Sequence, residues 1–419
     1  MTELEGARLG PRPLPLHLMV AALTWTTSRA ALPLLRSGSL PWRPELSEAG
    51  AALRESLESH PPEAVQAAVE RQLNARMTAL ADGILRYRRH PYRRDLPDPP
   101  VLWRAGTTRL LDYGASGSGP VRPVLVVPSL INRAYVLDLS AQRSLLRWLA
   151  GQGLRPFLID WDRPGPEERN FTLTDYIAGR LEAALDAVRA ETGTRPTVIG
   201  YCMGGLLALA LALRRQDDIA GLALLATPWD FHAGGRAGGD TQGALAAAAL
   251  PGLAPLMEAR GELPVDIIQG LFAGLDPQLV LRKFLAFARL DPDSPKAAAF
   301  VALEDWLNDG VPLSAPVARE CLGGWYGENT PARGTWRIAG QAVDPRRLNL
   351  PSLCVIPAQD RIVPPASARA LAGALAGTRT ETLVPRLGHI GMMVSAGAER
   401  QVWRPLANWL TAHAENAGR

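Results

Sequence analysis

The stretch Gly200-Tyr201-Cys202-Met203-Gly204 decides the fold of this 419-residue chain and narrows its chemistry. It follows the pattern G-x-S-x-G, which places a nucleophile in a tight turn between a strand and a helix and requires small residues on both sides. Cysteine stands here where a hydrolase would carry serine. Because one thiolate replaces another in a thioester at little energetic cost, this cysteine indicates thioester chemistry.

Apolar runs that alternate with helical segments predict the rest of the fold. We expect strands at residues 101–112, 123–128, 156–160, 196–201, 219–226, 351–357 and 379–385. This order predicts an α/β-hydrolase fold, with a mainly parallel sheet that helices cover on both faces. Over a hundred residues separate the strand that ends near residue 226 from the one that starts near residue 351, where the fold needs only a helix. We therefore expect an inserted cap domain above the nucleophile.

These expectations divide the chain into three parts. They are an N-terminal helical region at residues 1–98, a catalytic core at residues 99–228 and 346–419, and the cap insertion at residues 229–345. Within the first part, residues 63–88 carry apolar side chains at spacings of three and four. This spacing predicts an amphipathic helix that needs a partner surface.

A second, more apolar helix is expected between residues 14 and 35. Its apolar face would consist of Leu18, Ala21, Ala22, Trp25 and Leu32. Two prolines, a histidine and an arginine interrupt the stretch, so we predict no membrane span there. The helix either packs on the protein core or lies against an apolar surface.

Chain order locates two partners for Cys202. In this fold an acid follows a late strand, and a histidine comes near the end of the chain. Asp360 follows the apolar run at 352–357, and His389 lies between glycines after the run at 381–385. We therefore predict a Cys202-His389-Asp360 triad, in which His389 takes the thiol proton and Asp360 orients the imidazole.

The negative oxygen of a tetrahedral intermediate needs backbone N–H donors. The residue after the nucleophile supplies the first, which is the N–H of Met203. The second is expected in the loop after the strand at 123–128. We favour the N–H of Ile131, with Leu130 as the neighbouring alternative.

Five stretches of the chain resemble the polyhydroxyalkanoate synthases. They are VVPSLINRAYVLDL (126–139), LIDW (158–161), GYCMGG (200–205), TPWDFH (227–232) and GHIG (388–391). The resemblance also includes residues 336–340 and 343–344, so it spans roughly residues 100–410. The shorter, two-component synthases are the most similar, judged by residues 388–395 and by the compact length.

This resemblance implies an acyltransferase that polymerises 3-hydroxyacyl-coenzyme A. By this resemblance, Cys202 would be acylated and would elongate a polyester. Asp360 would orient the imidazole and, in this family, is also a candidate for activating the hydroxyl of the incoming monomer. Coenzyme A enters as a thioester substrate, and no cofactor or metal is expected. A homodimer, a partner synthase subunit and the surface of a polyester granule are the implied partners, in a cytoplasmic location.

Composition argues against several other classes of protein. A hydrophobic share of 47% and a charged share of 21% are typical of a globular protein. The net charge is only +4, and no stripe of lysine and aromatic residues accompanies the basic residues 86–94, so nucleic-acid binding has little support. Three widely spaced cysteines indicate a reducing compartment, and Glu3 and Glu5 argue against a secretory signal.

Two other functional classes stay open on the sequence alone. An acyl-coenzyme A thioesterase or an intracellular polyester depolymerase would use the same triad, although the double glycine Gly204-Gly205 favours a synthase over a depolymerase. A granule-associated relative without activity would not need the complete triad. The choice between synthase and hydrolase depends on whether water or a hydroxyacyl group reaches the acylated Cys202.

Overall fold

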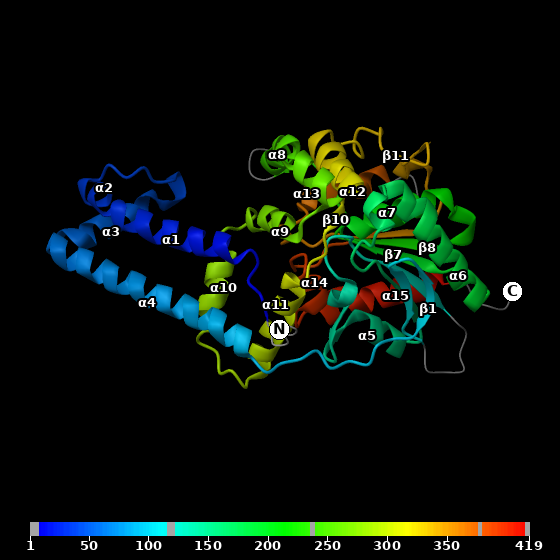
Figure 1. The fold of residues 1–419 in the computed structure, drawn as a ribbon, viewed down its shortest axis with the longest axis horizontal. Coiled ribbons are helices and arrows are strands. Elements are labelled where there is room, and N and C mark those ends of the chain that lie inside the picture. Colours follow the sequence, from blue (N-terminus) through cyan, green and yellow to red (C-terminus); the bar gives the residue numbers. More distant parts are fainter. Residues whose placement is uncertain (1–7, 115–121, 235–238, 376–378, 415–419) are drawn as a thin grey trace. The chain divides into compact units, whose positions relative to one another are not determined.

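Figure 1 shows the chain as a computed structural model, which describes residues 8–114, 122–234, 239–375 and 379–414. The chain divides into two compact units. Residues 94–271 and 309–419 form one, which we call the sheet unit. Residues 1–93 and 272–308 form the other, which we call the helical unit. Each is described by itself.

An eight-stranded sheet forms the centre of the sheet unit. Its strands, in spatial order, are β1 (Val101–Ala105), β2 (Thr108–Asp112), β6 (Arg155–Asp160), β3 (Pro123–Val127), β7 (Thr197–Tyr201), β8 (Gly221–Leu225), β13 (Ser352–Val355) and β14 (Thr380–Leu383). β2 pairs antiparallel with β1 and β6, and all other neighbours are parallel. The seven predicted strand regions are confirmed, and the first of them is a hairpin that turns at Gly106.

Helices cover both faces of this sheet. They include α5 (Leu145–Gly151), α6 (Glu182–Thr192), α7 (Met203–Arg214), α13 (Pro365–Ala374), α14 (Gly391–Val394) and α15 (Arg404–His413). α5 and α15 lie on one face, and α6 and α7 lie on the other (Figure 1). β3, β7 and β8 are buried along their whole length, which is typical of parallel strands between two helical layers. The expected α/β-hydrolase fold is confirmed.

Several short elements lie between β8 and β13. They are α8 (Gly239–Arg260), β9 (Glu262–Leu263), α9 (Val265–Ala273), β10 (Leu313–Ser314), α12 (Ala315–Arg319), a π-helical segment (Glu320–Gly327), β11 (Arg337–Ile338) and β12 (Gln341–Ala342). α8 packs on the π-helical segment, where Gly323 faces Leu250 and Gly327 faces Ala247. These elements belong to the sheet unit, except for the end of α9 after Leu271.

The helical unit is built from two stretches of chain. Its helices are α1 (Leu14–Ala30), α2 (Leu32–Ser37), α3 (Ser47–Glu58), α4 (Pro62–Arg89), α10 (Leu279–Phe287) and α11 (Pro295–Asn308). α4 confirms the amphipathic helix predicted at 63–88. One hydrophobic core joins α1, α4, α10 and α11, and it contains Ala21, Trp25, Leu80, Ile84, Tyr87, Phe284, Phe287, Ala297 and Val301.

These two units correct the division that we expected from the sequence. We assigned residues 272–308 to the cap at 229–345, but they pack with the N-terminal helices instead. The physical reason is the partner surface that α4 needs. α10 and α11 supply it, because Phe284 meets Tyr87 of α4 edge to face at a centroid distance of 5.7 Å.

The first helix also differs from its prediction. α1 buries His17, Ala21 and Trp25, whereas Leu18 and Leu23 are 44% and 55% exposed. Length and composition would allow one helical stretch among the described residues, Leu14–Ser37, to cross a membrane. Its 18-residue apolar window has a mean hydropathy of 1.2, and 17% of that window is buried. Core helices of soluble proteins and N-terminal signal sequences meet the same criterion, so the finding alone does not make it a span.

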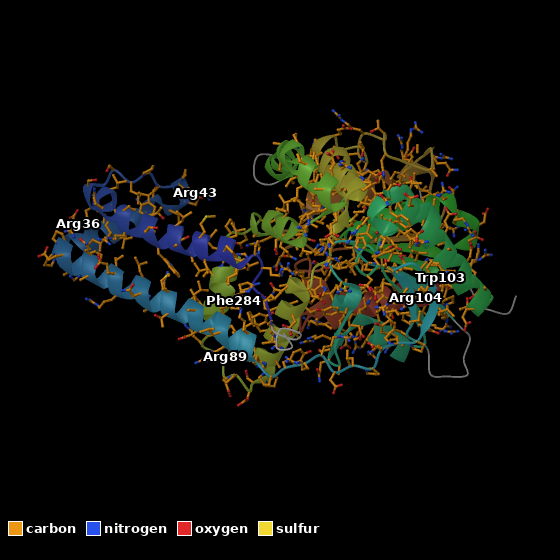
Figure 2. The ribbon with its side chains drawn as sticks, viewed as in Figure 1. Arg36, Arg43, Arg89, Trp103, Arg104 and Phe284 are labelled. Atoms are coloured by element: carbon orange, nitrogen blue, oxygen red, sulfur yellow. The ribbon has the colours of Figure 1, made fainter. Side chains whose placement is uncertain are left out.

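Phe284, labelled in Figure 2, offers a test of the core of the helical unit. It is fully buried and contacts Tyr87 and Phe300 edge to face. Phe284→Ala should destabilise this unit by about 3–5 kcal/mol, because it removes buried apolar surface and leaves a cavity. Chemical denaturation measures the free energy of unfolding, and proteolytic cleavage within residues 8–93 serves to monitor the unfolding of this unit.

Leu279→Ala is the matched control on the same helix. Leu279 is 49% exposed, so its truncation should change the stability by about 0.5 kcal/mol or less. Equal effects of the two substitutions would contradict the core that we describe.

Candidate active site

Cys202 stands in the turn between β7 and α7, as the elbow pattern predicts. Its backbone has a positive φ of 56° with ψ −126°, an unusual conformation for a residue with a side chain. Two backbone hydrogen bonds of 2.9 Å hold this turn. The N–H of Cys202 donates to the carbonyl of Leu225, and the N–H of Gly205 donates to the carbonyl of Cys202. Cys202 is partly exposed, and the buried helix α7 begins directly after it.

The glycines of the elbow allow a close approach of helix and strands. A Cβ on Gly200 would collide with the backbone of Gly204 and Gly205, and a Cβ on Gly204 would collide with the carbonyl groups of Val127 and Pro128. The start of α7 therefore lies directly against the end of β3. This brings the loop after β3 to the nucleophile.

His389 and Asp360 form a buried hydrogen-bonded pair. The Nδ1 of His389 lies 2.7 Å from the Oδ2 of Asp360, and both residues are 6% exposed. The other carboxylate oxygen accepts the N–H groups of Ile362 and Val363 at 2.8 and 2.9 Å. Asp360 is thus fixed by its own loop, and it fixes the imidazole in turn.

The charge of this pair is linked to Cys202. Burial acts to lower the pKa of His389, but the negative charge of Cys202 and hydrogen bonds to Asp360 and Cys202 outweigh burial and raise the pKa to about 10. At neutral pH, a protonated His389 therefore lies beside the sulfur of Cys202. A positive charge next to the sulfur favours the thiolate, which is the form of cysteine that attacks. The structure brings all three predicted triad residues together.

Tyr201 supports the histidine from the strand side. Its hydroxyl donates to the carbonyl of His389 at 3.2 Å, and the two rings lie 5.1 Å apart. Burial, together with the negative charges of Cys202 and Asp360, raises the pKa of Tyr201 well above its usual value. Tyr201 therefore stays neutral and acts as a hydrogen-bond donor.

Met203, which carries the first predicted oxyanion donor, directly precedes Gly204. Ile131, which carries the second, lies in the loop after β3, and the end of β3 contacts Gly204. The N–H of Met203 is at the first residue of α7, where the helix dipole adds positive potential. The N–H of Ile131 donates to the Oγ of Ser129 at 3.1 Å in this structure. The role of Met203, and the choice between Ile131 and Leu130, stay predictions.

An aromatic cluster of the insertion comes near the nucleophile at one residue, Tyr326, which interacts electrostatically with Cys202. Tyr326, in the π-helical segment, meets Phe231 edge to face at 4.9 Å, and Phe231 stacks on Trp325 at 5.8 Å. Burial and the charges of Cys202 and Cys321 raise the pKa of Tyr326, so its hydroxyl stays protonated. No motif pointed to Tyr326; only the density of aromatic residues in the insertion hinted at such a wall.

Polar bonds tie this aromatic wall to the chain after β8. The Oδ1 of Asn329 accepts the N–H of Phe231 at 3.0 Å, and its amide nitrogen donates to Asp230 at 2.8 Å. The Nε2 of His232 lies 2.9 Å from the carbonyl oxygen of Tyr326. The TPWDFH stretch, to which the sequence assigned no role, therefore positions the segment that carries Tyr326.

The two remaining cysteines are poor nucleophiles. Burial raises the pKa of Cys354 to about 12, and burial with the nearby charge of Glu320 raises the pKa of Cys321 well above its usual value. Neither supplies a thiolate at neutral pH.

Comparison with known proteins places the chain in a family. Residues 122–257 match the family described as alpha/beta hydrolase fold. The poly(3-hydroxyalkanoate) polymerase subunit PhaC of a Synechocystis species is 32% identical over 69% of this chain and 77% of its own length. The chain belongs to the poly(3-hydroxyalkanoate) polymerase family. The resemblance inferred from its motifs is confirmed.

Other polymerases show how much of the family's length is present. The polymerase subunit of Allochromatium vinosum is 30% identical, over 71% of this chain and 82% of its own length. The subunit of Haloferax mediterranei is 28% identical, over 75% of this chain but 64% of its own length. The chain therefore spans about two thirds of the length of that polymerase.

A solved structure supports the fold alone. A highly thermostable carboxyl esterase from Bacillus coagulans, in complex with glycerol, aligns with a TM-score of 0.50 at 13% identity. It covers 73% of this chain and 94% of its own. In the present chain, Cys202 occupies the turn between β7 and α7 of this fold.

The coupling of His389 to Cys202 is open to direct measurement. His389 should titrate near pH 10 by NMR of ¹⁵N-labelled histidine, and Cys202→Ala should lower this pKa, because the largest cause that raises it is removed. Since the folded-state value exceeds the usual 6.5, protonated His389 stabilises the fold fully below pH 6.5. This contribution is lost as the pH rises toward 10.

Cys354→Ala serves as the control, because Cys354 is buried in β13 and makes no contribution to the His389 shift. An unchanged His389 titration in Cys202→Ala would show that the thiolate and the imidazolium are not paired.

Proposed function

We propose that this protein is an acyltransferase that polymerises 3-hydroxyacyl-coenzyme A into a polyhydroxyalkanoate and releases coenzyme A. The observation that carries the proposal is a cysteine at the elbow, beside a hydrogen-bonded His389-Asp360 pair, in a chain of the polymerase family. Thioester exchange on a thiolate is the chemistry that this nucleophile favours. The relatives that match are named as polymerases.

In the first half of the cycle, the Cys202 thiolate attacks the carbonyl carbon of the thioester. The carbonyl oxygen becomes negative and is bound by the N–H of Met203 and by a donor from the loop after β3. The intermediate collapses, the bond to the coenzyme A sulfur breaks, and the imidazolium of His389 gives its proton to that sulfur. The products are acyl-Cys202, free coenzyme A and a neutral His389.

In the second half, a hydroxyl group attacks acyl-Cys202. It belongs either to the growing chain or to the next monomer. Neutral His389 accepts the hydroxyl proton, the new ester bond forms and the bond to the Cys202 sulfur breaks. This step restores the thiolate and the imidazolium, so protons balance over one cycle. Asp360 keeps the imidazole oriented through both proton transfers.

The aromatic wall supports a synthase over a hydrolase. Tyr326 interacts electrostatically with Cys202, and the rings of Phe231 and Trp325 extend the apolar surface behind it. Apolar walls bind an acyl chain and disfavour water at the acylated sulfur. A thioesterase or depolymerase would need water to reach the same atom.

We also propose the partners and the location that the resemblance implies. A partner synthase subunit or a homodimer would complete the enzyme, and matching relatives are named as polymerase subunits. The exposed Leu18, Met19 and Leu23 of α1 are suited to the surface of a polyester granule in the cytoplasm. No cofactor takes part in the proposed cycle.

Purified protein supplied with 3-hydroxybutyryl-coenzyme A should release coenzyme A and form insoluble polyester, with and without a candidate partner subunit. Cys202→Ala should lower turnover by about 10⁴-fold or more, as the loss of a triad nucleophile does. Free thiol detection and chromatography of the acyl products measure both results.

Cys354→Ala is the matched control and should keep its activity. Release of coenzyme A with free 3-hydroxybutyrate as the only product would replace the synthase by a thioesterase. Normal turnover of Cys202→Ala would contradict the nucleophile itself.

A further inference from the structure

The loop that follows β3 is held at one point by a short antiparallel ladder. The N–H of Val311 donates to the carbonyl of Ile131 at 3.2 Å, and Asn132 forms a backbone bridge with Gly310. The next pair in the same register is Arg133 with Asp309, whose Nε and Oδ1 lie 3.1 Å apart. The loop is thus held by one backbone bridge and by a side-chain ion pair at the next position.

Arg133 extends this ladder to a third segment. Its Nη1 donates to the Oδ1 of Asp162 at 2.7 Å, in the loop after β6. Asp162 has a left-handed backbone, with φ 54°, and its Oδ1 also accepts the N–H of Arg163 at 2.7 Å. A guanidinium presents several N–H groups in a rigid plane, so one arginine can bridge two carboxylates that a lysine could not hold in the same geometry.

The loop that is held in this way carries the predicted second oxyanion donor. Ile131 is two residues before Arg133, and the start of the loop lies against Gly204 of the elbow. An oxyanion donor acts only if it is fixed where the charge develops, and a displacement of about 1 Å costs roughly 10²-fold in rate. The position of this loop is therefore part of catalysis.

We propose that Arg133 is a positioning residue, which fixes the oxyanion loop by bridging Asp162 and Asp309. This inference rests on the proposed acyl transfer, and it applies equally to Ile131 and Leu130, because both lie in the loop that the bridge holds. Arg133 itself does not touch the acyl group. It acts through the backbone of the two residues before it.

Two reactions of Cys202 separate this role from a general loss of structure. Iodoacetamide alkylates the thiolate by displacement at a saturated carbon, so no oxyanion forms. Acylation by p-nitrophenyl butyrate or by 3-hydroxybutyryl-coenzyme A passes through a tetrahedral oxyanion. Arg133→Met should slow acylation by both reagents by about tenfold to hundredfold, while the alkylation rate stays at the wild-type value. The acylation rate of Arg133→Lys should lie between those of the wild type and of Arg133→Met.

Arg155 offers the matched control. It also bridges two acids, with Asp112 at 2.6 Å and Glu191 at 2.7 Å, but it lies at the start of β6, the opposite end of that strand from Asp162. Arg155→Met should change neither rate. Asp309→Asn should weaken acylation as Arg133→Met does, and the double variant should lose less than the two single losses combined.

Each outcome has a defined meaning. Equal losses of acylation and alkylation, or no loss of acylation in Arg133→Met, would overturn the positioning role. If the wild-type protein were acylated by the ester but not by the coenzyme A thioester, the proposed function would be refuted. The role of Arg133 would then be decided by the acylation rates with the ester. A wild-type protein that is alkylated but acylated by neither reagent would overturn both.

Discussion

The positive φ angle of Cys202 is the constraint on which the site depends. Such a conformation costs about 1–3 kcal/mol for a residue with a side chain, and it persists only where its surroundings define it fully. Here the backbone of Cys202 is fixed by its hydrogen bond to Leu225 of β8 and by the hydrogen bond that it accepts from Gly205 in the first turn of α7. Since Gly204 also allows contact with the end of β3, one tight turn aligns the nucleophile, the helix and the oxyanion loop together.

Strained backbone recurs along the same edge of the sheet. Asp162 after β6, Cys202 after β7 and Ala226 after β8 all have positive φ angles, of 54°, 56° and 48°. The carboxyl ends of parallel strands meet at one edge, where ligands bind in folds of this type. The central strands β3, β7, β8 and β13 are buried along their whole length, and they stabilise this edge. Strain and chemistry are therefore concentrated in the same few loops.

The sheet and the triad could be predicted because their signals are local. The strand residues are continuous apolar runs between turns, and the order of Cys202, Asp360 and His389 follows the order of the strands that carry them. The partner of α4 could not be predicted, because an amphipathic face does not specify which helix will cover it. The same applies to α1, where His17 is buried and Leu18 is exposed although hydrophobicity alone favours the reverse. Tyr326 and the Arg133 bridge depend on contacts between distant segments, which no single stretch of sequence encodes.

The helical unit is discontinuous in the chain, and this restricts how the gene could be shortened. A truncation that removed residues before 94 would leave α10 and α11 within the remaining chain, since they belong to the same core as α1 and α4. Phe284 and Val301, both fully buried, would then face water together with Phe287. Such an apolar patch promotes aggregation. A shortened version of the protein that lacks α1 and α4 therefore has to lose α10 and α11 as well.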